Sequence, residues 1–190
     1  MDVLRNFLDT TDAVTELVSR VPVEKMDEPA YGAWDLRSLI GHTSRAMSTV
    51  IRYLKMPATH VTCDDVVGYY VHIAQTPGED DAIAQRGIQA GIDLGPDVSA
   101  GFASLARQVR GVLEAQPPGV DPVVSTLAGG MLLSHYLPTR TFELIVHGYD
   151  IAHAVDIDFT PHPDSVADTV LLAARVGIAL GHGPRLVPVL

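Results

Sequence analysis

Residues 140–150 read RTFELIVHGYD, and this segment indicates the kind of fold that the rest of the chain must form around it. Its apolar residues cover most of a helical circumference, so we predict a largely buried helix over residues 138–155. Pro138 suits the first helical position, because its missing amide hydrogen would be unpaired there in any case. The surrounding chain must therefore provide a core that encloses this helix.

Four polar residues interrupt the apolar surface of this helix at steps of three, four and three: Arg140, Glu143, His147 and Asp150. This spacing stacks them on one narrow line. Unpaired buried charges are costly, so the line must be paired, hydrated or bound to a metal. Glu143 and His147 can direct a carboxylate oxygen and an imidazole nitrogen at the same ion. The alternative is a line that faces water, but the line is narrow and contains no lysine, which favours the metal.

A third ligand is available from a second predicted helix, residues 35–55, which Asp35 can cap. His42 lies there beside the apolar stripe, either as an ordinary core residue or as a ligand. Metal sites in helix bundles are made from inward polar groups on facing helices. Three protein ligands would leave coordination positions for water and substrate, as in catalytic sites. His60 and Cys63 offer an alternative pair of ligands in a loop.

The rest of the chain gives long helical patterns and almost no strand signal, which predicts an all-α helix bundle. After residue 89, Gly91 and Gly95 are expected to loosen the chain, as is Gly87 just before it. A polar linker covers residues 21–33. Further helices are predicted over residues 3–20, 66–74, 79–89, 98–115 and 164–180, with a short extended connector over 123–127.

Composition limits the kinds of function that need considering. A chain of 190 residues with 47% hydrophobic and 19% charged residues predicts one folded domain over residues 1–190. The net charge of −10 argues against nucleic acid and acidic membrane surfaces as partners, because both need a basic face. With no long apolar run and no signal peptide, we expect a cytoplasmic protein. The single cysteine, Cys63, excludes an internal disulfide and a thiolate-rich zinc cluster.

Two segments resemble a known family. Residues 33–42, AWDLRSLIGH, resemble the W-S/T-x-x-D/E-L/V-x-x-H segment of mycothiol-dependent maleylpyruvate isomerase-like proteins, in the DinB/YfiT-like superfamily. Residues 143–152, ELIVHGYDIA, resemble the E-x-x-V-H-x-W/Y-D-I/L-A segment of the same family and are the more specific match. With the order of helices and the long middle connection, the resemblance covers nearly the whole chain.

The resemblance implies a DinB-like four-helix bundle with a long crossover and extra short helices. It implies a metal, usually zinc, held by His42, Glu143 and His147, although such a site also accepts nickel, iron or manganese. The implied partners are the small thiol mycothiol as cosubstrate and an electrophilic substrate. Full isomerases carry a second, C-terminal domain, which we expect to be absent here, and a homodimer is common in the superfamily.

We therefore expect a metal-dependent, mycothiol-dependent thiol transferase or isomerase-like enzyme acting on a small electrophile. Arg140 and Asp150 are the candidate catalytic residues. Arg140 can pair with Glu143 or with a substrate carboxylate, and Asp150 can orient a ligand or a neighbouring helix. The alternative is an ordinary ion pair between the two or with other helices. Tyr70, in the crossover, is the candidate residue for binding the cosubstrate. Two alternatives stay open: a non-enzymatic bundle in which the metal serves structure, sensing or dimerisation, and a bundle without metal that serves as an interaction module.

Overall fold

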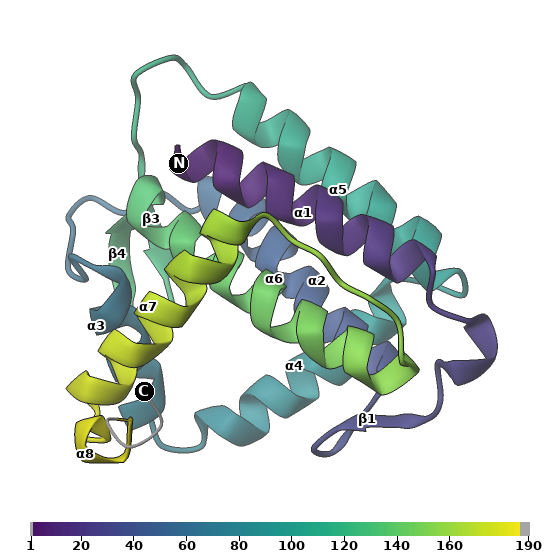
Figure 1. Cartoon of the computed structure of the whole chain (residues 1–190). Helices are drawn as coiled ribbons and strands as arrows, with labels where there is room; N and C mark the ends of the chain where they lie inside the picture. The colour runs from purple at the N-terminus through teal and green to yellow at the C-terminus, as the bar shows by residue number, and fades with distance from the viewer. Residues whose placement is uncertain (1, 187–190) are drawn as a thin grey trace.

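A computed structural model describes residues 2–186, and helices account for most of the chain (Figure 1). The bundle consists of helices α1 and α2 from the first third of the chain and helices α5 and α6 from later in it. Both α1 and α2 pack against both α5 and α6. This arrangement confirms the predicted all-α, DinB-like bundle. The bounds of the four helices are Val3–Ser19 for α1, Leu36–Leu54 for α2, Val98–Glu114 for α5 and Leu133–Val155 for α6.

The core lies between these four helices and is formed by their apolar stripes. Burial of such side chains is the main favourable contribution to folding, so the stripes fix how each helix is rotated. Each bundle helix contributes side chains with at most 1% exposure: Phe7, Val14, Leu17, Leu39, Ile40, Met47, Phe102, Val109, Leu144 and Ile151.

Residues 55–97 form the long crossover between α2 and α5, as expected. The crossover contains α3 (Val66–Gln75), which packs against α6, and α4 (Glu79–Asp93), which packs along α2. After α6 the chain continues into α7 (Pro163–Ala179), which lies across α3 and α6 in Figure 1, and ends its described part in α8 (Gly183–Leu186). None of the helices within residues 2–186 is both long and apolar enough to cross a bilayer.

Two small antiparallel hairpins complete the structure. The predicted linker of residues 21–33 contains a short 3₁₀ turn, Val23–Lys25, and strand β1 (Pro29–Tyr31), which pairs with β2 (Trp34–Asp35). The predicted extended connector is strand β3 (Val123–Thr126), which pairs with β4 (Gly129–Leu132). The first hairpin is important for the site, because it places Trp34 directly before the start of α2.

The predicted start of α6 at Pro138 is wrong, because the helix begins at Leu133 and holds Pro138 inside its second turn. The cause is a cap from outside the helix. The Asp121 carboxylate accepts hydrogen bonds from the backbone amide of Ser134, at 2.9 Å, and from its hydroxyl, at 2.5 Å. This satisfies an amide of the first turn, so the proline costs only one later hydrogen bond.

The predicted loosening of the chain at Gly87 and Gly91 is also wrong, because α4 continues through both glycines to Asp93. The two glycines instead allow α4 to approach α2 closely. A Cβ atom on Gly87 would lie 2.9 Å from the Trp34 indole, and one on Gly91 would lie 2.8 Å from the Arg37 carbonyl oxygen. Packing between the helices therefore overcomes the low helix propensity of glycine.

Candidate metal centre

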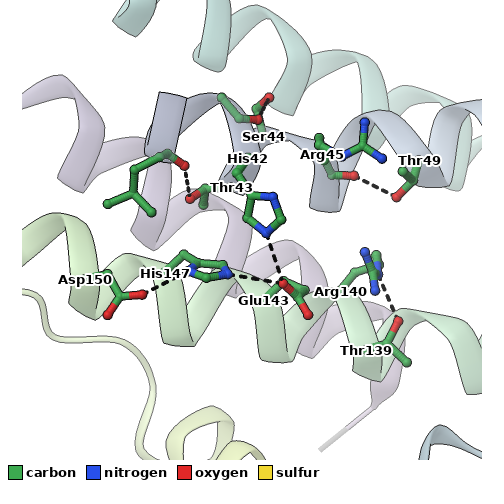
Figure 2. A network of polar contacts seen from close by, with 12 residues as sticks. His42, Thr43, Ser44, Arg45, Thr49, Thr139, Arg140, Glu143, His147 and Asp150 are labelled. Carbon is green, nitrogen blue, oxygen red and sulfur yellow. Dashed lines mark hydrogen bonds and ion pairs between the residues drawn. The ribbon is translucent and has the colours of Figure 1, made fainter. Parts of the chain in front are cut away.

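The three predicted ligands meet where α2 faces α6 (Figure 2). His42 points from α2 toward Glu143 and His147, which lie one turn apart on α6. The Glu143 Oε2 atom lies 3.5 Å from His42 Nε2 and 3.3 Å from His147 Nε2. One donor atom from each residue falls within 4.8 Å of the other two. Two imidazole nitrogens and a carboxylate oxygen arranged around one point form a donor set that suits a divalent metal.

Local sequence explains how α2 presents His42. Asp35 caps the helix by accepting a hydrogen bond from the Ser38 amide at 2.8 Å, as predicted. Leu39 and Met47 then point into the core with no measurable exposure. His42 lies at the edge of this apolar face, where α2 meets α6, and only 13% of its side chain is exposed.

His147 is oriented by Asp150, whose Oδ2 atom lies 2.9 Å from His147 Nδ1. The carboxylate holds a proton on Nδ1, which turns Nε2 toward Glu143. Burial lowers the pKa of His147, but hydrogen bonds with Asp150 and Glu143 outweigh it and raise the pKa to about 9. Without an ion, His147 is thus protonated at neutral pH. The predicted role of Asp150 in orienting a ligand stays a prediction.

Glu143 is held on its other oxygen by Tyr70 of α3. The Tyr70 hydroxyl lies 2.9 Å from Glu143 Oε1 and 2.9 Å from the Thr139 carbonyl oxygen. Burial and the nearby Glu143 charge raise the pKa of Tyr70, so its phenol stays protonated and can act as a hydrogen-bond donor. The pKa of Glu143 is well below its ordinary value. Burial by itself would raise it, but hydrogen bonds from His147 and His42 together have the larger effect. The carboxylate is therefore ionised, with Oε2 turned toward the histidines.

His42 has a different environment from His147. Its ring stacks on the Trp34 indole, with ring centroids 4.5 Å apart and planes at 28°. Burial lowers the pKa of His42 more than its hydrogen bond to Glu143 raises it. The ring is therefore neutral, which is the state that binds metals. Its Nδ1 atom is buried and has no hydrogen-bond partner among the described residues.

Arg140 lies on the same helix as the ligands but is committed to other contacts. It is 7% exposed, and its guanidinium donates to the Thr139 hydroxyl at 2.8 Å and to the Tyr69 hydroxyl at 3.1 Å. It also lies over the rings of Tyr69 and Tyr136, at 5.3 and 4.8 Å from their centroids. Arg140 is thus fixed beside the site rather than on the ligand atoms.

A small pocket of about 70 Å³ opens beside the ligands. Arg140 contributes to its wall, and so do two arginines that the sequence did not single out, Arg45 of α2 and Arg86 of α4. Arg45 lies three residues after His42 and so on the same face of α2, and this spacing was the one sequence signal that could have placed it at the site. Arg86 could not be placed without knowing that α4 packs on α2. His42, Tyr70 and Glu143 also line the pocket, so it is continuous with the candidate metal centre.

The alternative ligand pair in the loop before α3 is not part of this group of donor atoms. Cys63 is buried, and its thiol donates to the Asp65 carbonyl oxygen at 3.6 Å. Burial raises the pKa of the Cys63 thiol, which disfavours the thiolate that a metal would need.

The fold and the site together define a helical-bundle protein with a candidate divalent-metal centre between two facing helices. The chain belongs to the family described as the mycothiol maleylpyruvate isomerase N-terminal domain, whose sequence model matches residues 7–152. This family is DinB-like and metal-binding. The match runs from α1 to near the end of α6 and includes His42, Glu143 and His147. Comparisons with curated proteins and with solved structures gave no match.

Proposed function

We propose that this protein is a metal-dependent enzyme that uses mycothiol to modify or isomerise a small electrophile. The observation that supports it most is the three-residue donor set of His42, Glu143 and His147, open on the side of a cationic pocket. The family description names mycothiol and an isomerase, and it supports the choice of thiol and reaction class. Maleylpyruvate itself is not part of the proposal.

His42, Glu143 and His147 would hold the ion, for which zinc is our choice, while nickel, iron and manganese suit the same donors. A bound divalent metal would keep the thiol sulfur deprotonated and fixed in place. Asp150 contributes by holding the proton of His147 on Nδ1. Tyr70 contributes by anchoring one oxygen of Glu143, so that the other stays directed at the ion.

The pocket supports an electrophile that carries a carboxylate. Three arginines line it in a protein whose net charge is −10, so the cationic wall is a local feature. Guanidinium groups bind carboxylates through charge-assisted hydrogen bonds. Because Arg140 is already bonded to Thr139 and Tyr69, we propose that Arg45, whose side chain is partly exposed, binds the substrate.

The size of the pocket favours a second candidate function, a bundle that binds metal without catalysis. Its volume of about 70 Å³ is well below the roughly 300–1,000 Å³ of typical ligand sites. In that case the metal would stabilise the bundle or serve in sensing or dimerisation. The enzymatic proposal instead requires the pocket to widen when its substrates bind.

Metal analysis of the purified protein, followed by a mycothiol conjugation assay, tests both candidates. We expect about one equivalent of metal in the wild type and none in His147→Ala, since loss of one of three ligands removes a large share of the affinity. Turnover of mycothiol with an electrophilic acid would then support the enzyme. Stoichiometric metal without turnover across several electrophiles would favour the second candidate, and a wild type without metal would contradict both.

A further inference from the structure

The indole of Trp34 is held rigidly over one of the candidate ligands. Trp34 is 8% exposed and stacks on the His42 imidazole at 4.5 Å between centroids. Its Nε1–H donates to the Ala84 carbonyl oxygen of α4 at 3.0 Å. Gly87, one turn further along α4, leaves room for the indole, because a Cβ there would lie 2.9 Å from it. The indole is therefore enclosed between α4 and His42.

The two candidate histidine ligands are oriented by different means. His147 has the usual arrangement, a carboxylate on the ring nitrogen that does not face the site. His42 lacks it, because its Nδ1 is buried without a partner among the described residues. No hydrogen bond at Nδ1 thus fixes the tilt of the His42 ring about its side-chain bonds. Glu143 contacts Nε2 and the His147 ring meets the His42 ring edge-on at 4.7 Å between centroids, but it is Trp34 that stacks on the face of the ring.

We propose that Trp34 is a positioning residue for the metal centre: it holds the His42 ring by stacking, in place of the missing hydrogen bond. The inference rests on the proposed metal centre. Offset stacking is a directional contact between aromatic rings, so it can set the plane of the imidazole and the direction of Nε2. Since α4 anchors the indole through Ala84, the crossover is coupled to the metal centre through Trp34.

Trp34→Leu and Trp34→Phe test the proposal when each is titrated with Co²⁺, whose visible absorption reports ligand geometry. Leucine fills space without stacking, and phenylalanine restores an aromatic face. We expect Trp34→Leu to bind Co²⁺ about tenfold or more weakly, as when other partners that orient ligands are lost, and with an altered spectrum. Trp34→Phe should recover most of the affinity and the wild-type spectrum.

Phe102→Leu is the matched control, because Phe102 is a fully buried aromatic residue of α5. It should lower the melting temperature while leaving Co²⁺ affinity and spectrum unchanged. Gly87→Ala is a second variant, which keeps the indole but displaces it, and it should shift the Co²⁺ spectrum even if Trp34→Leu folds poorly. If Trp34→Leu folds and keeps the wild-type Co²⁺ affinity and spectrum, the positioning role alone is overturned. If Trp34→Leu does not fold, the same result in a folded Gly87→Ala overturns it. A wild type that binds no Co²⁺ would overturn the metal centre as well.

Discussion

The Asp150 carboxylate lies 2.9 Å from Nδ1 of His147, while Nε2 of the same ring faces Glu143 at 3.3 Å. Asp150, His147 and Glu143 therefore form a continuous chain of polar contacts along one side of α6, which Figure 2 shows extending across to His42. At one end of this series of contacts Asp150 holds the proton on Nδ1 of His147, and at the other end Glu143 and His42 present the metal-ligating atoms. Its members can be tested separately.

Asp150→Asn should weaken metal binding by about tenfold, because an amide holds the Nδ1 proton less strongly than a carboxylate does. His147→Ala should have a larger effect, since it removes the ligand itself. Competition titrations against a chromophoric chelator would give both affinities. Asp158→Asn, which changes an exposed aspartate, is the control and should bind metal like the wild type. Equal affinity in Asp150→Asn and the wild type would contradict the role of the carboxylate.

Metal binding should release a proton at neutral pH. The pKa of His147 is raised to about 9 in the absence of an ion, so at pH 7 the ring is protonated and a metal must displace that proton. The pKa of His42 is lowered, so this ring is already neutral at pH 7 and has no extra proton for the metal to displace. Apparent affinity should rise with pH from 7 toward 9 and then level off. Calorimetric titrations in buffers of different ionisation enthalpy would count the protons, and a count of zero at pH 7 would argue against this protonation state.

Tyr70→Phe should weaken both the metal site and the fold. It removes the hydrogen-bond donor to Glu143 and leaves the Thr139 carbonyl without this contact. Loss of a typical hydrogen bond costs about 0.5–1.5 kcal/mol in the free energy of unfolding, and more where a buried acceptor is left without a partner. Denaturant unfolding and Co²⁺ titration would measure the two effects. Tyr53→Phe removes the hydroxyl of a buried tyrosine of α2 and should leave the Co²⁺ affinity unchanged.

Arg45→Gln should raise KM for a carboxylate-bearing electrophile by about 10–150-fold, the effect of losing a charge-assisted hydrogen bond of about 1.5–3 kcal/mol. KM for mycothiol and metal content should change little, because Arg45 is not among the donor residues. Steady-state kinetics with acidic and neutral electrophiles would separate the effects. Arg52→Gln, an exposed arginine of the same helix, is the control. An equal rise in KM for neutral electrophiles would show that Arg45 does not act on the carboxylate.

The features that the sequence predicted well depend on residues close together in the chain. Asp35 caps α2 through an amide three residues away, so its role was visible in the local pattern. Glu143 and His147 are one helical turn apart, and Asp150 is three residues beyond His147, so predicting that this segment is helical was enough to align them. His42 was a candidate because it lies beside the apolar stripe of its own helix, but its assignment as the third ligand came from the family resemblance, because spacing cannot relate residues on two helices.

The errors arose where distant segments meet. Pro138 indicated a helix start, but a cap from Asp121 moved that start to Leu133. Gly87 and Gly91 have low helix propensity, but close packing of α4 on α2 kept them helical. In both cases a contact between distant segments outweighed the local helix propensity, and such a contact cannot be predicted from the local sequence pattern.

The sequence by itself determined an all-helical chain with a polar line on a buried helix, because backbone geometry fixes the side-chain positions within one helix. Only the tertiary structure decided that Trp34 stacks on His42 and that Arg45 and Arg86 share one pocket wall. Those relations depend on how side chains from separate helices fill a common core, and the packing sets the rotation and distance of each helix.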